Sequence, residues 1–376
     1  MVRRVYLHIG LPKTATTYLQ DGLWRHQDEL RRRQVLLPGR SRRRHLLASL
    51  DFRDDPKLAT RPGDVARPWQ DLVEEIQQSD APTAVISHEF FGPAAVEQIR
   101  RGVEQLAPAE VHVALTARPM TELAPSQWQE WVKNGGRKPI DEFPPRDDYS
   151  PHDAWGWGAF DLGDVLARWS QAVPAERIHV LPMGARGAEP GEIWRRFIDL
   201  LGVPGPELAA PEKPVNQRLG LVQVEALRKI NQKLKGFSSG YDRGAWIRGY
   251  LGSAPVMPAG SERFRPAPET WAGWVERGES AVAMLRTDDY DVRGDVDALM
   301  PRREQPDVRH PDEVSADELL EVTSEMVSTM LTDVRSRNRE RHSLRERLRN
   351  AEASSMRPQP SAPARLVRRV RGVLGR

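Results

Sequence analysis

The residues with the clearest chemical potential lie near the start of the chain, where His8–Thr17 reads HIGLPKTATT. This segment predicts a short apolar strand, a Gly/Pro turn, a lysine at position 13, and small hydroxyl residues that begin a helix. Main-chain N–H groups at a helix N-terminus point outward with partial positive charge, and Lys13 adds a full charge. The segment therefore predicts a site for a phosphate or sulfate group.

The spacing within this segment differs from that of a nucleoside triphosphate loop, which reads G-x-x-x-x-G-K-[ST]. Here two residues separate Gly10 from Lys13, and Pro12 stands where a second glycine is needed. Such a loop is too short to wrap two bridged phosphates and suits one terminal group. The spacing weighs against a P-loop-type nucleotide-dependent kinase, which stays open as an alternative.

A second pair of anion-binding residues follows the strand expected over Val111–Ala117. Arg118 comes directly after that strand, Pro119 forces a turn, and Ser126 lies eight residues beyond Arg118 on the expected helix. A guanidinium and a hydroxyl in this arrangement can hold one phosphate from two sides.

Together these two segments resemble the sulfotransferases that use 3′-phosphoadenosine 5′-phosphosulfate (PAPS), and in particular their bacterial and carbohydrate-specific branches. Gly10–Thr17 resembles the family's loop for the 5′-phosphosulfate. Arg118 and Ser126 resemble its 3′-phosphate motif at the same spacing. The resemblance covers residues 1–235, and Tyr290–Leu299 also looks like a segment of bacterial relatives.

One family feature is absent. The Arg-Lys-Gly segment that caps the 3′-phosphate in cytosolic members has no counterpart in this chain. Asn216–Arg218, or an arginine within residues 236–265, is a candidate for replacing it.

The resemblance implies transfer of the sulfuryl group of PAPS to a hydroxyl or amine of an acceptor, with a carbohydrate or glycoconjugate as the expected class. Lys13 would neutralise charge on the bridging oxygen. A sulfate ester carries a single negative charge, so no metal is expected, unlike ATP chemistry. The implied donor-binding residues are Gly10, Lys13, Thr14, Ala15, Thr16, Thr17, Arg118 and Ser126.

The acceptor must lose a proton, which requires a base. Glu89 and His88 follow the expected strand Thr83–Ser87 and rank nearly level as candidates, and His45 ranks below them. Phenylalanines beside Glu89 suggest a carboxyl pKa raised by desolvation. Trp155 and Trp157, in the loop HDAWGWG, are candidates for stacking on a sugar.

The elements that must position these residues alternate between strands and helices. This alternation predicts an α/β fold with a P-loop-like parallel sheet, flanked by helices on both faces, and a C-terminal helical extension. Ligands bind such sheets at the carboxyl ends of the strands, where the candidate residues fall. The expected strands are Arg4–Ile9, Thr83–Ser87, Val111–Ala117 and Arg177–Leu181, and the expected helices are Thr14–Arg31, Pro93–Leu106, Thr121–Asn134, Leu162–Ala172, Glu192–Leu201 and Leu219–Leu234.

The 376 residues divide into a predicted sulfotransferase domain (1–310), a long amphipathic helix (311–353) and a basic tail (354–376). The domain has a PAPS-binding core (1–235) and a region of irregular loops (236–275). The tail is expected to be disordered or to contact anionic membrane. A non-catalytic interaction protein that acts through this tail is the second alternative.

Composition limits the partners, metal sites and cellular location that we expect for this protein. The net charge is +3, and residues 357–376 contribute six arginines and no acid, so the rest of the chain is net acidic and no nucleic-acid partner is expected. The absence of cysteine excludes disulfides and thiolate metal sites. No segment has the apolar length of a membrane span, and the N-terminal apolar stretch is too short for a secretory signal. We expect a cytoplasmic protein.

Overall fold

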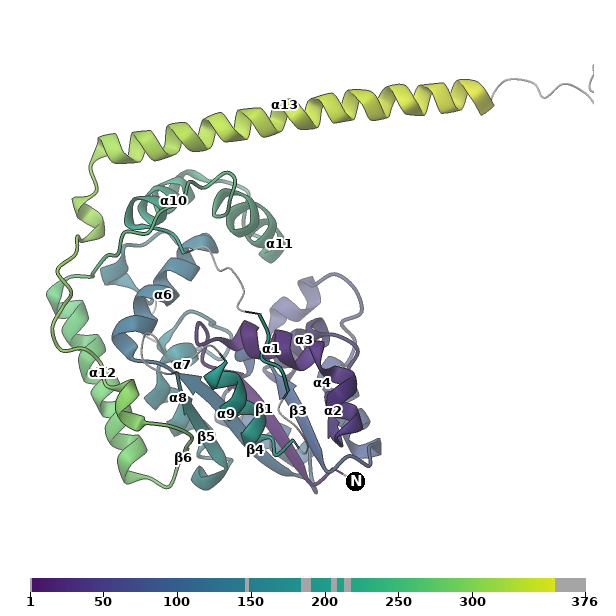
Figure 1. Ribbon diagram of the computed structural model, residues 1–376, viewed down its shortest axis with the longest axis vertical. Coiled ribbons are helices and arrows are strands. Elements are labelled where there is room, and N and C mark those ends of the chain that lie inside the picture. The colour runs from purple at the N-terminus through teal and green to yellow at the C-terminus, as the bar shows by residue number, and fades with distance from the viewer. Residues whose placement is uncertain (1, 146–148, 184–190, 204–207, 213–217, 356–376) are drawn as a thin grey trace, which may run out of the picture. The chain divides into compact units, whose positions relative to one another are not determined.

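The computed structural model describes residues 2–145, 149–183, 191–203, 208–212 and 218–355. The chain forms two compact units, Met1–Val322 and Thr323–Arg376. The first unit contains a six-stranded sheet with the order β2-β3-β1-β4-β5-β6, and every neighbouring pair of strands is parallel (Figure 1). The strands are β1 (Arg4–Gly10), β2 (Val35–Leu36), β3 (Thr83–Ser87), β4 (Glu110–Ala117), β5 (Ile178–Pro182) and β6 (Asp291–Val292).

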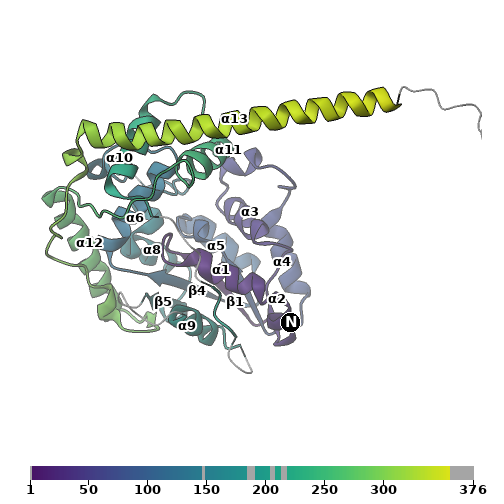
Figure 2. The same ribbon diagram turned by 45° about the horizontal axis from the view of Figure 1, so that its top comes forward.

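Helices cover both faces of this sheet, which confirms the predicted α/β fold. Figure 2 shows α1 and α9 in front of the sheet and α5 and α8 behind it. The α-helices of the first unit are α1 (Thr16–Arg25), α2 (Gln27–Arg32), α3 (Arg42–Phe52), α4 (Pro68–Gln78), α5 (Val96–Gln105), α6 (Met120–Lys133), α7 (Trp157–Phe160), α8 (Leu162–Trp169), α9 (Glu192–Leu200), α10 (Leu221–Lys233), α11 (Gly240–Asp242) and α12 (Pro268–Thr287).

The central strands are buried on both sides because their sequences are apolar at almost every position. In β1 each residue after Arg4 is buried, and all five residues of β3 are buried. Such continuous apolar runs are typical of parallel strands covered by helices. The four predicted strands are found with ends within one residue of those expected.

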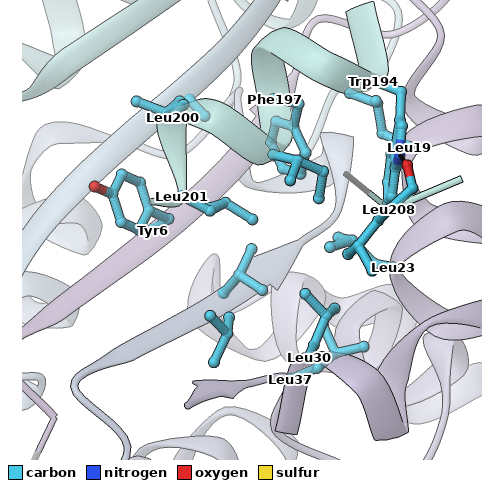
Figure 3. Packing of buried hydrophobic residues seen from close by; sticks show 14 of the residues in the cluster. Tyr6, Leu19, Leu23, Leu30, Leu37, Trp194, Phe197, Leu200, Leu201 and Leu208 are labelled. Carbon is cyan, nitrogen blue, oxygen red and sulfur yellow. Dashed lines mark hydrogen bonds between the residues drawn. The ribbon is translucent and has the colours of Figure 1, made fainter. Parts of the chain in front are cut away.

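One face of the sheet packs against α1, α2 and α9 through a shared apolar cluster. Figure 3 shows Leu19 and Leu23 of α1 beside Trp194 of α9, while Tyr6 of β1 lies at the other end of the cluster, near Leu201. Gly22 of α1 lies against the Trp194 ring, where a Cβ atom would come within 2.4 Å of it. The absence of a side chain at Gly22 therefore fixes how closely α1 approaches α9.

An aromatic cluster joins the helices beyond β3. The ring of Phe52 in α3 contacts Trp69 of α4 at 4.9 Å, Phe91 at 5.2 Å and Trp169 of α8 at 6.3 Å. The first two pairs are edge-to-face and the third is stacked, and aromatic pairs of both kinds stabilise by roughly 0.5–1.5 kcal/mol beyond their buried area. This cluster holds the segment after β3, which carries His88 and Glu89, against the body of the unit.

Two expectations about helices need correction. The single helix expected over Thr14–Arg31 begins at Thr16 and is divided at His26 into α1 and α2. Residues 236–275 are not irregular throughout, because α11 leads into a π-helix over Arg243–Leu251 and α12 begins at Pro268. Gly- and Trp-rich composition conceals both helices in the sequence.

The long C-terminal helix α13 covers Ala316–Ser355, and a 3₁₀ turn over Pro311–Glu313 precedes it. The second unit consists of the part of α13 after Val322 together with the residues that follow. The Arg-rich end of the expected basic tail, from residue 356, lies outside the described residues. Among the helices described, none combines the length and the apolarity needed to cross a membrane.

Candidate functional site

The candidate anion loop leaves the carboxyl end of β1 and is held against β4. The N–H of Leu11 donates to the carbonyl of Thr116 at 2.8 Å, which continues the sheet past Gly10. Gly10 has φ +108°, and a Cβ atom there would lie 3.1 Å from the Cβ of Glu89. A glycine is therefore required where the loop passes Glu89, and the loop and the segment after β3 are in direct contact.

The backbone of this loop alternates in handedness. Lys13 and Ala15 have φ +63° and +65°, whereas Thr14 between them has no positive φ. Alternation of this kind turns successive N–H groups toward one side and forms an anion-binding concavity. Ala15 is the N-cap of α1 and has no side-chain oxygen to satisfy the first N–H groups of the helix. The loop therefore has the donor set of an anion site.

The hydroxyl groups of the loop differ in their roles. Thr14 is fully buried, and its Oγ1 donates to the carbonyl of Leu11 and lies 2.7 Å from Oγ1 of Thr116. The hydroxyl of Thr14 thus supports the fold, and only its main-chain N–H is available to a ligand. Thr16 is 4% exposed, while Oγ1 of Thr17 accepts a hydrogen bond from Arg42 at 3.3 Å.

Arg118 lies beside the loop, as its position after β4 predicts. Its Nη1 donates to the main-chain carbonyl of Lys13 at 3.4 Å. Its Nη2 lies 3.3 Å from Oγ of Ser126 and also donates to the carbonyl of Glu122. The structure therefore brings the two predicted anion-binding segments together at one edge of the sheet.

Helix α6 contacts the anion loop through several side chains. Besides Ser126, it supplies Gln127, whose Nε2 donates to the carbonyl of Pro12 at 3.1 Å. One turn after Ser126, Oε2 of Glu130 pairs with Nζ of Lys13 at 3.0 Å. This helix fixes both the backbone of the anion loop and the ammonium group that the loop carries.

Sequence reasoning missed Glu130 because a single acidic residue in a helix usually faces solvent. Its carboxylate is in fact 11% exposed and also pairs with Nε of Arg248, at 3.0 Å. Arg248 belongs to the π-helical segment and is one of the arginines expected to supplement the donor site. Burial raises the pKa of Glu130, but Lys13 and Arg248 outweigh this effect and hold it below its usual value.

Glu89 lies on the 3₁₀ turn after β3 and is held in place by α1. Its Oε2 accepts a hydrogen bond from Nε2 of Gln20 at 3.1 Å, and its side chain is 21% exposed. Burial raises the pKa of Glu89, whereas His88, Gln20 and Arg42 lower it, and the net effect is a lowered pKa. This corrects the expectation that desolvation dominates at Glu89.

His88 is fixed in one tautomer by its own main chain. Its Nδ1 accepts a hydrogen bond from the N–H of Phe90 at 3.1 Å, so in the neutral ring the proton is on Nε2. Burial lowers the pKa of His88, and Glu89 opposes this effect. Neutral His88 can therefore donate a hydrogen bond from Nε2 but has no free lone pair there to accept a proton.

His45 uses both ring nitrogens within the fold. Its Nε2 donates to the carbonyl of Pro38 at 2.8 Å, and its Nδ1 accepts from the N–H of Ser87 at 3.2 Å. The ring is fully buried, and burial lowers its pKa to about 4. His45 therefore supports the end of β3, and neither of its ring nitrogens is available to a substrate.

Trp155 and Trp157, the two residues expected to bind a sugar, make their contacts with other parts of the chain than the anion loop. The ring of Trp157 stacks under the guanidinium of Arg277 from α12, 4.1 Å from its centroid. The N–H of Trp155 donates to Oδ1 of Asp153 at 2.8 Å. Neither ring contacts the anion loop within the described part of the chain, so their place in an acceptor site stays a prediction.

The other sequence candidates fall at the margins. Residues 213–217, including most of Asn216–Arg218, lie outside the described residues. Tyr290–Leu299 contributes β6 at the edge of the sheet. Among the residues that the structure describes, no group of three or more His, Asp or Glu side chains could hold a metal ion.

Comparison with known proteins adds little to this geometry. No protein-family model and no curated protein sequence matches the chain. A solved structure that it resembles is that of a sulfotransferase from Alicyclobacillus acidocaldarius, with a TM-score of 0.38 and 14% sequence identity over 61% of this chain and 93% of that one. A similarity this low does not establish a shared family.

Proposed function

We propose that the protein is a sulfotransferase that takes its sulfuryl group from PAPS and transfers it to a hydroxyl group of an acceptor. The observation that supports this most is the meeting of Arg118 with the anion loop, where its guanidinium donates to the carbonyl of Lys13 at 3.4 Å. Two separate anion-binding groups at one sheet edge suit a nucleotide that is phosphorylated at both its 5′ and 3′ positions.

The residues present fit such a donor. The concave backbone around Lys13 and Ala15, together with the N-terminus of α1, offers N–H groups for one terminal anion. Arg118 donates to Oγ of Ser126 at 3.3 Å, so the guanidinium and the hydroxyl, once it turns from the carbonyl of Glu122, can both donate to one second phosphate beside them. PAPS supplies an activated sulfuryl group, whose bond to the 5′-phosphate oxygen breaks as a new bond to the acceptor oxygen forms.

Lys13 is the group that stabilises negative charge on the leaving oxygen. Its ammonium pairs with Glu130 of α6 at 3.0 Å, which limits the positions that the side chain takes. A cation at the point where negative charge develops stabilises the transition state.

Glu89 is our candidate for the base that accepts the acceptor's proton. Its lowered pKa keeps the carboxylate ionised at neutral pH, and its Cα atom lies beside the place that Gly10 occupies. His88, with its proton on Nε2, is instead a hydrogen-bond donor to the acceptor or to the transferred group.

Thermal unfolding of the protein with the desulfated product PAP, in EDTA, tests the donor site. Binding of PAP to the folded protein raises the unfolding temperature. Lys13→Ala should reduce this shift and abolish sulfuryl transfer, whereas Lys138→Ala, at a lysine that is 49% exposed, is the matched control. Stabilisation by ATP with Mg²⁺ but not by PAP would instead favour the kinase alternative.

A further inference from the structure

One side of α13 exposes large apolar side chains at helical spacing. The members of this set are 50–65% exposed, and they are Leu320, Val327, Leu331 and Val334. On an α-helix, which turns by about 100° per residue, all four fall within a stripe about 60° wide. Val322 and Met326 lie on the opposite side of the helix and are buried. A continuous apolar stripe on the surface indicates an interaction site.

The second half of α13 is exposed on all sides. Every residue from 335 to 352 is exposed, and the helix continues through them without a break (Figure 1). Leu344 and Leu348, at 52% and 60% exposure, lie four residues apart, as Val327 and Leu331 do. Packing of one face, rather than intrinsic propensity, stabilises most helices in proteins. Within the described chain, this half of α13 therefore lacks the packing partner that its apolar residues suit.

The charges of α13 are separated along its length. Residues 316–334 carry five carboxylates and no lysine or arginine, which gives a net charge of −5. Residues 335–352 carry seven arginines and three glutamates, which gives a net charge of +4. Some of these groups pair within the same chain, as Asp333 does with Arg337 at 2.9 Å, but the two halves keep opposite signs. Two such helices repel when they run side by side in the same direction and attract when they run in opposite directions.

The apolar residues match in the same antiparallel arrangement. When two copies of α13 pair about the middle of residues 337–338, Val327 of one copy lies opposite Leu348 of the other. Leu331 lies opposite Leu344 in this register, because both members of each pair are equally far from that point. The twofold symmetry repeats both contacts on the other side of the axis. A twofold pairing is closed, so it gives a dimer rather than a filament.

We propose that α13 is a dimerisation helix, and that α13 of a second copy of this chain, running antiparallel, covers its exposed stripe. The pairing places the acidic half of each helix beside the basic half of the other and brings their exposed leucines and valines together. This inference goes beyond the proposed sulfotransferase function and uses none of the donor-site residues. A failure of one therefore leaves the other intact.

The mass of the full-length protein in solution tests the proposal directly. Size-exclusion chromatography with light scattering should give twice the chain mass of 42.6 kDa at high micromolar concentration. Raising NaCl from about 0.01 M to about 1 M shortens the Debye length from about 30 Å to about 3 Å, so the dissociation constant should rise at least tenfold. A monomer at every concentration in low salt would overturn the proposal, and a dimer insensitive to salt would overturn its charge-matched arrangement.

Two variants of the same helix test whether the apolar stripe forms the contact. Leu331→Arg places a charge within the stripe and should raise the dissociation constant at least tenfold. Ser336→Arg adds the same charge about 140° around the helix and should leave the protein dimeric. All eleven tryptophans lie outside α13, so unchanged tryptophan fluorescence shows that the rest of each variant is folded. If Leu331→Arg remains as dimeric as Ser336→Arg, the dimer forms through another surface and the proposal is wrong.

The orientation of the helices can be read from single cysteines, because the chain has none of its own. A mixture of Leu331→Cys and Leu344→Cys proteins should form a covalent dimer on oxidation. Leu331→Cys alone should not, because its two copies lie about 20 Å apart along antiparallel helices. A parallel pair would give the reverse pattern, with Leu331→Cys crosslinked to itself, and would contradict the antiparallel arrangement.

An anionic membrane is the competing occupant of a helix with so many arginines. Flotation with vesicles of phosphatidylcholine, with and without phosphatidylserine, distinguishes it from a second copy. A protein that is monomeric in solution and floats only with the phosphatidylserine vesicles, in a manner that Leu331→Arg reduces, would assign the stripe to the membrane and reject the dimer.

Discussion

The guanidinium of Arg118 donates to the main-chain carbonyl of Lys13 at 3.4 Å, although 105 residues separate them in the chain. This contact joins the end of β4 to the loop after β1. It explains how two short motifs can address one ligand. The same guanidinium also donates to Oγ of Ser126 at 3.3 Å, and that hydroxyl donates to the carbonyl of Glu122 at 3.1 Å.

We predict that Arg118→Met selectively weakens binding of a 3′-phosphate. Hydrogen bonds to a charged group contribute about 1.5–3 kcal/mol, so the affinity for PAP should fall roughly 10- to 100-fold. The affinity for 5′-AMP, which lacks the 3′-phosphate, should change far less. Isothermal titration of both nucleotides measures this. An equal loss for PAP and 5′-AMP would mean that Arg118 only supports the loop through Lys13.

The carboxylate of Glu130 competes with the donor for Lys13, since it holds the ammonium at 3.0 Å. We predict that Glu130→Gln tightens PAP binding by roughly fivefold, equivalent to about 1 kcal/mol of relieved competition. The turnover number should fall at the same time, because Lys13 loses the group that directs it. A titration with PAP and a steady-state assay separate these effects, and weaker PAP binding would contradict the prediction.

The sequence was informative where a local pattern determines structure, and much less so where a contact crosses between elements. The apolar runs of β1, β3, β4 and β5 predicted the central sheet because each is long enough to show burial. The edge strands β2 and β6 have two residues each, too few for any periodicity. The tight turns at Gly10 and Pro119 located the anion-binding residues for the same local reason.

Local sequence patterns could not predict which side chains pair with one another within the site. The pairing of Glu130 with Arg248 depends on where the π-helical segment meets α6, and no spacing in the chain encodes that meeting. His45 looked available for chemistry in the sequence. Its two ring nitrogens are engaged by Pro38 and Ser87 only because α3 packs against the end of β3.

The pH dependence of turnover should distinguish Glu89 from His88 as the base. The net lowered pKa of Glu89 keeps its carboxylate ionised at neutral pH, so the rate is retained at higher pH and lost as the pH falls through that pKa. The acid limb of kcat/KM should therefore lie at or below the ordinary range of a glutamate. Because burial also lowers the pKa of His88, the limb is assigned by substitution: a limb that is unchanged in Glu89→Gln would identify another group as the base.

The variant Glu89→Gln gives the matching kinetic test. Removing a general base typically costs about 10²–10⁴ in rate, and PAP affinity should stay within about threefold because the donor loop is untouched. His88→Gln retains a hydrogen-bond donor and should lose less than Glu89→Gln. The reverse order of the two losses would contradict the assignment of the base.

Stability should decrease in mild acid because of buried neutral histidines. Burial lowers the pKa of His8 and of His45 to about 4, while both rings titrate near 6.5 in the unfolded chain. The unfolded state therefore binds more protons between these values, so stability is complete above about pH 6.5 and is lost as the pH falls toward 4. Each ring accounts for about 3 kcal/mol of this loss.

Urea unfolding at pH 7.5, 6 and 5 measures that loss. His8→Phe removes one of the titrating rings, and the decrease in unfolding free energy between pH 7.5 and 5 should become smaller than in the wild type. The ring of His8 lies 5.0 Å from that of Phe197, so an aromatic replacement retains this packing. An unchanged decrease in His8→Phe would show that His8 does not titrate as its burial implies.

The position of α1 depends on the absence of a side chain at Gly22. A Cβ atom there would come within 2.4 Å of the Trp194 ring, which is fully buried and cannot easily move away. Overpacking of this kind costs about 1–3 kcal/mol, so Gly22→Ala should lower the free energy of unfolding by that amount. Gly273→Ala is the matched control, because it lies in α12 with open space around it and should stabilise by up to about 1 kcal/mol.

Because α1 begins at the anion loop, Gly22→Ala should also weaken PAP binding, whereas the control should not. Equal stability of the two variants would show that Trp194 can yield, and that the packing of α9 does not fix the anion loop.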